Sequence, residues 1–305
     1  MANRTDEDVV RRVRSTLALM HRWGYAPSVE VLARQLLGGS VELGELRAIL
    51  DRRPDLTLRD DFVCLRGSEP LLGRSKERIG MNRRHAEDAW GIARDYARDF
   101  VRACPFVECV ALSGSLASGG YGPHDDIDFD LIVQPGSKYT TYLLAHLVGL
   151  KYGWRYRDRR LDDLHHTPFL PKIACINVVW TEDQMRPFER RDENMAFELM
   201  RAIPLYGVRR FEDALGDNPW LRDFFPQTYG RVWPEEPRER RSWVGRVLEG
   251  VQRNPRMAAF LERVSRGVAW RLYRGVQGSR VRNPVAVARM EFLRRAKYPY
   301  EVFQD

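Results

Sequence analysis

The chain has 305 residues, of which 44% are hydrophobic, and it carries a formal net charge of +8 at pH 7. This length and composition allow two or three folded modules with apolar cores. No stretch approaches the roughly 20 apolar residues of a membrane span, and the polar, acidic residues 1–8 exclude an ordinary signal peptide, so we expect a cytoplasmic protein without a membrane partner.

The first 68 residues predict three short helices followed by a β-hairpin. Apolar residues recur at helical spacing in the helices, and Ser28 is a suitable cap for the second one. The hairpin is predicted from two short alternating runs joined by polar residues. The helices are expected at residues 6–22, 28–37 and 41–51, and the hairpin strands at 56–58 and 62–65.

This order of elements resembles a winged-helix module, a domain whose third helix enters the major groove of DNA. The resemblance covers residues 5–67. The predicted third helix displays Glu42, Glu45 and Arg47, a mixed face rather than a basic one. Protein docking or a structural role for the module therefore stays open beside DNA binding.

Residues 69–80 predict a linker, because Pro70, Gly73 and Gly80 interrupt them. A long helix is then expected over residues 83–102, with an apolar stripe that packs against a sheet. The expected organisation is an N-terminal module, a linker, a central core and a helical region rich in arginine. Their bounds are 1–68, 69–80, 81–207 and 208–305.

The central core begins with a buried strand at residues 107–112, which ends at Ser113, Gly114 and Ser115. Glycine permits close approach of the backbone to a ligand. If a helix begins near Ser115, its free amide groups favour a polyphosphate, and the Ser115 hydroxyl donates to a phosphate oxygen. The glycines of the following loop give it freedom to wrap around a triphosphate.

Three aspartates follow this loop, at Asp126, Asp128 and Asp130. Alternate residues of a strand share a face, so the three carboxylates project one way. Two unit charges about 4 Å apart repel by about 4 kcal/mol at an effective dielectric near 20. A hard divalent cation removes this cost, and Mg²⁺ prefers carboxylate oxygens and substrate phosphates.

The arrangement of Gly114-Ser115 and Asp126-x-Asp128 resembles the polymerase-beta-like nucleotidyltransferase superfamily over residues 80–205. The resemblance implies an α+β fold, in which a small mixed β-sheet is flanked by helices. It also implies a metal-dependent enzyme that moves a nucleoside monophosphate from a nucleoside triphosphate, such as ATP, to a hydroxyl or phosphate and releases pyrophosphate. Asp126 and Asp128 then bind Mg²⁺ or Mn²⁺, and Gly114 and Ser115, with Ser113, hold the triphosphate. The acceptor stays open, with nucleic acid as one candidate.

Many members of that superfamily carry a third carboxylate on a neighbouring strand. The matching strand here is expected at residues 172–180, and its polar residue is Asn177. Asparagine orients a water or a metal ligand but is no carboxylate base. Asp130 is the candidate substitute, and a second interpretation is a catalytically impaired regulatory protein that binds a nucleotide or a nucleic acid.

Residues 151–166 interleave aromatic and basic side chains after a helix predicted at residues 138–150. Trp154 and Tyr156 alternate with four arginines. Such a pattern suits stacking on an unpaired base, and an exposed, charged β-hairpin explains it equally well. His165 and His166 are more typical of surface residues after a helix cap than of a proton acceptor.

Beyond the core, a helix is expected at residues 194–203 and a turn at 203–207. Residues 229–305 contain 17 Lys and Arg against 8 Asp and Glu, a local net of +9. Arginine-rich helices at residues 256–276 and 284–297 present a face that tracks a phosphate backbone. The four cysteines are scattered along the chain, which predicts buried, reduced thiols.

Overall fold

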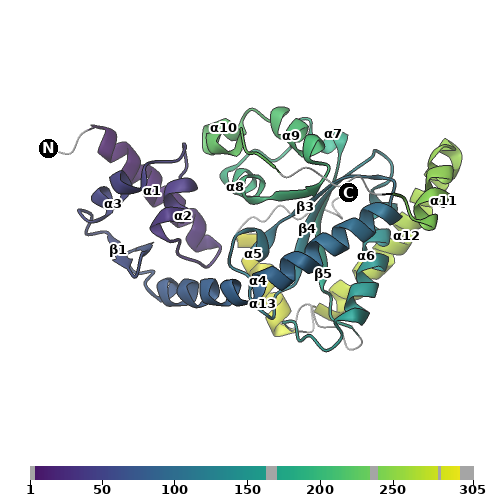
Figure 1. Cartoon of the computed structure of the whole chain (residues 1–305), viewed down its shortest axis with the longest axis horizontal. Coiled ribbons are helices and arrows are strands. Elements are labelled where there is room, and N and C mark those ends of the chain that lie inside the picture. The colour runs from purple at the N-terminus through teal and green to yellow at the C-terminus, as the bar shows by residue number, and fades with distance from the viewer. Residues whose placement is uncertain (1–3, 163–169, 234–239, 281–282, 296–305) are drawn as a thin grey trace.

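The computed structural model describes residues 4–162, 170–233, 240–280 and 283–295. The chain is an α+β protein with two small sheets among its helices (Figure 1). All four cysteines are buried and free, as predicted. Within the described ranges, no helix has both the length and the apolar content that crossing a membrane requires.

Three helices and a hairpin form the N-terminal module, in the predicted order. The Ser28 hydroxyl accepts a hydrogen bond from the Val31 amide and caps the second helix. Val13, Leu17 and Leu32 lie in a core that is closed to solvent. The elements are α1 (Arg4–Arg22), α2 (Val29–Arg34), α3 (Leu43–Leu50), β1 (Leu56–Arg59) and β2 (Phe62–Leu65).

The predicted linker is wrong, because residues 70–80 are the first turns of one long helix, α4 (Pro70–Ala103). Pro70 occupies the first turn, where its missing N–H is not needed. Gly73 and Gly80 each cost about 1 kcal/mol in a helix, but burial of Leu72 and a hydrogen bond from the Ala26 amide to the Ser75 hydroxyl (2.8 Å) hold this end of the helix against the module. Packing therefore outweighs the glycine signal.

The central sheet has the strand order β5-β4-β3-β6. Its strands are β3 (Val107–Leu112), β4 (Ile127–Val133), β5 (Ala174–Thr181) and β6 (Ile203–Tyr206). β4 and β5 are parallel and the other pairs antiparallel, so the sheet is mixed, as predicted. β6 corrects the turn expected at residues 203–207: it pairs with β3, and only Gly207 has the positive φ (72°) of a turn residue.

Helices cover both faces of this sheet. α4 and α6 (Lys138–Arg155) pack on the face that carries Phe129 and Leu131. The other face, with Ala111 and Ile132, packs against α8 (Glu193–Arg201), α9 (Val208–Gly216) and α10 (Leu221–Phe224). The N-terminal module joins this second layer, since the Gly38 amide donates to the Phe224 carbonyl (2.7 Å). Three one-turn elements complete the core: α5 (Gly114–Ala117), α7 (Glu182–Met185) and η1 (Pro226–Thr228).

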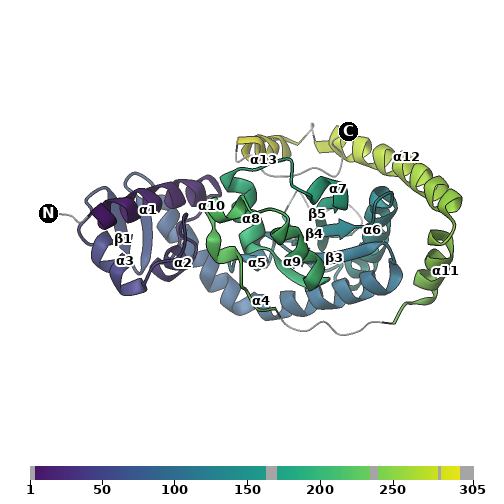
Figure 2. The same cartoon turned by 90° about the horizontal axis from the view of Figure 1, so that it is seen from above.

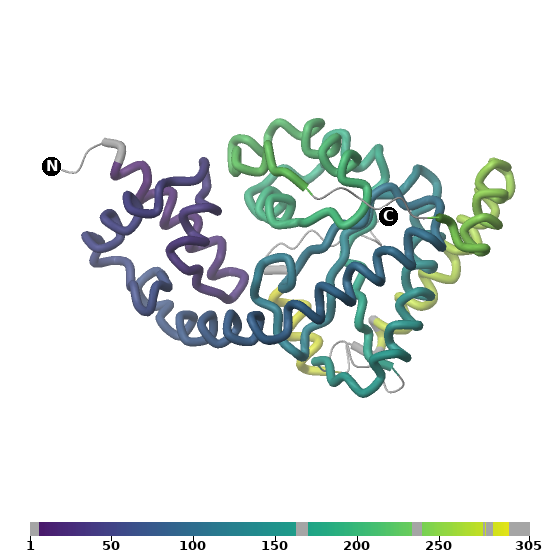
Figure 3. The backbone as a smooth tube through the Cα atoms, viewed as in Figure 1, coloured from purple at the N-terminus to yellow at the C-terminus, as the bar shows by residue number. Residues whose placement is uncertain are grey.

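The C-terminal region passes around the outside of the core as α11 (Trp243–Gln252), α12 (Pro255–Arg280) and α13 (Pro284–Arg295) (Figure 2). The last two were expected, and α11 was not. Glu262 of α12 accepts hydrogen bonds from the Tyr139 and Thr140 amides (2.7 and 2.9 Å), which caps α6 from another helix. Phe292 of α13 meets Trp23, the residue after α1, edge to face. Figure 3 shows the path of the backbone from the N-terminal module to α13.

Candidate functional site

The turn after β3 brings its backbone against a carboxylate of β4. Gly114 has φ +64°, and a Cβ at this position would overlap Oδ2 of Asp128 and lie 2.7 Å from its Cγ. The Ser113 amide donates to the Asp128 carbonyl (3.0 Å). Only glycine allows both this backbone conformation and the close approach. The position of the Asp128 side chain therefore depends on a glycine at residue 114.

Ser113 connects the buried polar side chains beneath this turn. It is 2% exposed, its hydroxyl donates to Oδ1 of Asp130 (3.1 Å), and it accepts from Nδ2 of Asn177 (3.4 Å). Asn177 reaches this position because the β4–β5 register shifts: Phe129 faces Ile176 and Asp130 faces Val178. Asn177 is the extra residue of a bulge, a device that re-aims a side chain at a site.

Asp126 and Asp128 lie close together, as the spacing predicts. Asp126 directly precedes β4 and is 8% exposed, and Asp128 is half-buried. A ligand atom of each lies within 4.8 Å of the other and of Cys175 Sγ. Asp130 shares the face of Asp128 but is not part of this group, and its carboxyl is engaged with Ser113.

The carboxyls perturb one another. Burial, followed by the charge of Asp126, raises the pKa of Asp128 well above its ordinary value, while a hydrogen bond from Asn177 and the charge of Lys172 act in the opposite direction. Burial and the charge of Glu198 raise the pKa of Asp130 to about 8. A divalent cation against Asp126 and Asp128 relieves the same repulsion.

Three neighbours of the site were not foreseen from the sequence. Lys172 donates to Cys175 Sγ (3.1 Å), and its pKa is about 12, since the effect of burial is outweighed by nearby acidic groups. Burial raises the pKa of the Cys175 thiol to about 12. Glu198 belongs to α8, in the helical layer that packs against the sheet face of Ala111 and Ile132. No motif marks them, and only the pairing of β4 with β5 and the packing of α8 bring them here.

The predicted helix start near Ser115 is a single turn, Gly114–Ala117. The dipole of one turn is small, so it adds little to the binding of a phosphate. Ser115 is half-buried, and its carbonyl accepts from the Gly120 amide (2.9 Å). The predicted contact of Ser115 with phosphate is therefore without this support.

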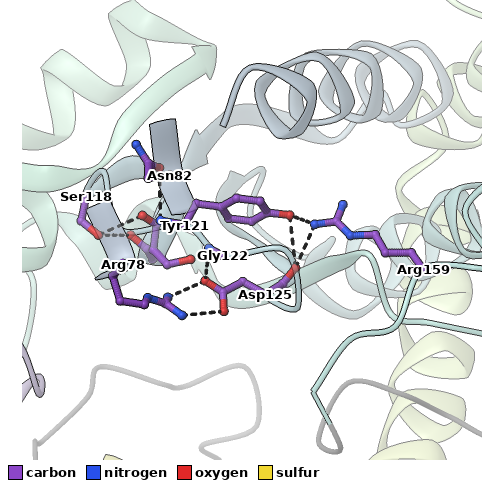
Figure 4. Close-up of polar contacts among 9 residues, drawn as sticks. Arg78, Asn82, Ser118, Tyr121, Gly122, Asp125 and Arg159 are labelled. Carbon is purple, nitrogen blue, oxygen red and sulfur yellow. Dashed lines mark hydrogen bonds and ion pairs between the residues drawn. The ribbon is translucent and has the colours of Figure 1, made fainter. Parts of the chain in front are cut away.

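The loop between the two motifs is fixed rather than free to wrap a triphosphate (Figure 4). Asn82 of α4 accepts from the Tyr121 amide (3.1 Å), and Arg78 of α4 forms a two-pronged ion pair with Asp125 (2.5 and 3.2 Å). Arg159 reaches the same loop from the opposite side and donates to the Tyr121 hydroxyl. Glycine flexibility is therefore overridden by three side chains from two segments, α4 and the turn after α6.

The β-hairpin expected as one explanation of residues 151–166 is wrong. α6 continues to Arg155, and the residues after it form a turn. Trp154 is 65% exposed. His165 and His166 lie outside the described residues.

The hairpin tip of the N-terminal module is acidic. Asp60 forms an ion pair with Lys76 of α4 (2.7 Å), and Asp61 pairs with Arg47 of α3. These pairs tie the tip to its own helices.

No protein-family model matches the chain, and neither a curated protein nor a solved structure does. The chemistry of the site is therefore inferred from its residues and their geometry.

Proposed function

We propose that this protein is a metal-dependent nucleotidyltransferase, which moves a nucleoside monophosphate from a nucleoside triphosphate to an acceptor hydroxyl or phosphate. The observation that carries the proposal is the contact between Gly114 and Asp128. A glycine at φ +64° is unstrained, and its lack of a side chain lets the turn lie against a carboxylate that any Cβ would overlap. This close approach suits a site in which phosphate oxygens near the turn and a cation near the carboxylate lie within one coordination sphere.

The donor set suits Mg²⁺ or Mn²⁺. Asp126 and Asp128 offer hard carboxylate oxygens within 4.8 Å of one another. Cys175 is the third nearby group, and burial raises the pKa of its thiol; sulfur is a soft ligand, whereas Mg²⁺ prefers oxygen. A bound metal ion supplies charge neutralisation to the transferring phosphoryl group.

The other residues orient this pair. Asn177 donates a hydrogen bond to Asp128, which orients the carboxylate and favours its ionised form. Ser113 joins Asn177 to Asp130. Lys172 places a positive charge beside Asp126 and limits the repulsion between the carboxylates before a metal binds.

The test is a titration of ATP, CTP, GTP and UTP, each with Mg²⁺ or Mn²⁺, monitored by melting temperature. A ligand at 100 times its dissociation constant stabilises the fold by about 2.7 kcal/mol. We expect one triphosphate to raise the melting temperature only with metal, and Asp128→Asn to abolish this effect. The matched control is Asp213→Asn, an acid-to-amide change at an exposed position of α9. Full metal-dependent binding by Asp128→Asn refutes the assignment.

A second candidate is a regulatory protein that binds a nucleotide without turning it over. The observation in its favour is Asn177, an amide on β5 beside Asp128. Asparagine is no general base. Metal-dependent binding of a triphosphate without release of pyrophosphate, with any acceptor offered, selects this candidate over the enzyme.

A further inference from the structure

The end of α6 and the turn after it form a basic-aromatic strip, which we define as residues 154–160. With Lys151, this stretch has five cations and one anion. Three guanidinium groups lie over aromatic rings: Arg157 over Trp154 (5.4 Å), Arg155 over Tyr156 (5.5 Å) and Arg159 over Tyr121 (5.5 Å). The strip is thus a row of stacked cation and ring pairs.

Most of this row is open to solvent. Trp154 is 65% exposed, and Arg155, Arg157 and Arg160 are exposed as well. Among the residues that the structure describes, these three arginines form no ion pair with a carboxylate. An exposed indole beside cations that have no carboxylate partner among the described residues matches what an unpaired base and its phosphate require.

The strip leads directly to the carboxylate site. The Asp162 amide donates to the His124 carbonyl (3.0 Å), and Arg159 Nε donates to the Pro123 carbonyl (3.3 Å). These acceptors lie two and three residues before Asp126. Trp154 is within about 18 Å of Arg159, because five residues span at most about 3.6 Å each.

We propose that the basic-aromatic strip binds an unpaired polynucleotide and directs its end toward Asp126 and Asp128. The inference rests on the proposed function in naming this strand as the acceptor. A duplex is excluded by the same features, because its bases are stacked on one another and offer no free face to Trp154. The structure thereby favours stacking over the hairpin interpretation of the same residues.

The binding experiment uses fluorescein-labelled 20-mers of deoxythymidine and of uridine, and a duplex of equal length, with anisotropy recorded at 50 and 200 mM salt. We expect the single strands to bind at least tenfold more tightly than the duplex. Trp154→Ala should weaken single-strand binding by about tenfold or more. Arg157→Ala should reduce the slope of log affinity against log salt by about 0.7, the value for one phosphate contact of a single strand.

The matched control is Trp243→Ala, which removes an indole 71% exposed on α11. It should leave single-strand binding unchanged. Poly-glutamate is the second control, a polyanion without bases, and it should displace the oligonucleotide poorly at equal charge. The inference is overturned if the duplex binds as tightly, if Trp154→Ala binds like wild type, if Trp243→Ala is equally impaired, or if poly-glutamate competes equally.

Failure of the strip and failure of the proposed function are distinguishable in the same variants. Trp154→Ala should keep the metal-dependent triphosphate shift, and Asp128→Asn should keep single-strand binding. If the wild type binds the single strand but shows no triphosphate shift, the proposed enzymatic function is refuted and the proposal for the strip stands. If the wild type shows the triphosphate shift but does not bind the single strand, the proposal for the strip is refuted and the acceptor is another molecule.

Discussion

Replacing Gly114 by alanine is the sharpest test of the candidate site. The new Cβ would overlap the Asp128 carboxylate, so this side chain has to leave its rotamer, at a cost of about 0.5–1.5 kcal/mol. It also weakens the hydrogen bond from Asn177, which contributes about 1 kcal/mol. Alanine at a positive φ costs a further 1–2 kcal/mol or so.

Gly119→Ala is a matched control for this last contribution. Gly119 has φ +74°, close to that of Gly114, but no atom lies within 4 Å of a Cβ there. The backbone cost is therefore common to both variants, and their difference isolates the overlap with Asp128. We expect Gly114→Ala to be less stable than Gly119→Ala by about 2 kcal/mol in urea unfolding.

Ligand binding separates the two variants further. Gly119→Ala should keep the metal-dependent triphosphate shift in melting temperature, and Gly114→Ala should lose it, since Asp128 no longer lies in place. Equal stability of the two variants contradicts the geometry described for the turn. A normal triphosphate shift in a folded Gly114→Ala protein refutes the role of this turn in the site.

Three further predictions concern parts of the fold that support the core. Burial lowers the pKa of His146 to about 4, so the unfolded chain binds a proton first as the pH falls, and the contribution of this residue to the free energy of unfolding falls by about 2 kcal/mol between pH 7 and 5. The stability difference between wild type and His146→Gln in urea unfolding should shift by about this amount between the two pH values, and a constant difference contradicts this. Glu262→Ala removes the cap that α12 supplies to α6 and should cost about 1–2 kcal/mol in the same assay. At Gly207 a Cβ would overlap the Glu108 backbone, so Gly207→Ala should lower the free energy of unfolding by at least about 3 kcal/mol. Gly136 has a similar φ and open space around a Cβ, so Gly136→Ala should cost only about 1 kcal/mol. Similar losses in the two variants would argue against the tight β3–β6 contact.

Local chemistry made the N-terminal module and the central motif predictable. Ser28 is recognisable as a helix cap because its hydroxyl acts within three residues. Gly114 and Asp128 are recognisable because both residue types are unexpected in their positions. Gly114 lies at the end of a buried strand, and Asp128 is one of the carboxylates that alternate along the next strand. Their closeness then follows from the antiparallel pairing of β3 with β4, two strands that follow one another in the sheet.

Long-range packing decided what the sequence did not predict. Gly73 and Gly80 indicate a break, yet contacts with the N-terminal module keep them helical. β6 is short and contains Pro204, which is typical of a turn, but an edge strand accepts a proline because one side needs no partner. Lys172 and Glu198 carry no local signal, since a lone lysine or glutamate is far more common at a surface than in a site.

The loop between Gly114 and Asp126 depends on both local sequence and long-range packing. Its sequence predicts flexibility, and its structure is determined by residues distant from it: Arg78 and Asn82 come from α4, and Arg159 follows α6. α4 is a single helix that also holds the N-terminal module, and Arg159 belongs to the basic-aromatic strip. The position of Asp126 therefore depends on both the module and the strip, because a displacement of either segment breaks hydrogen bonds to the loop that ends at this carboxylate.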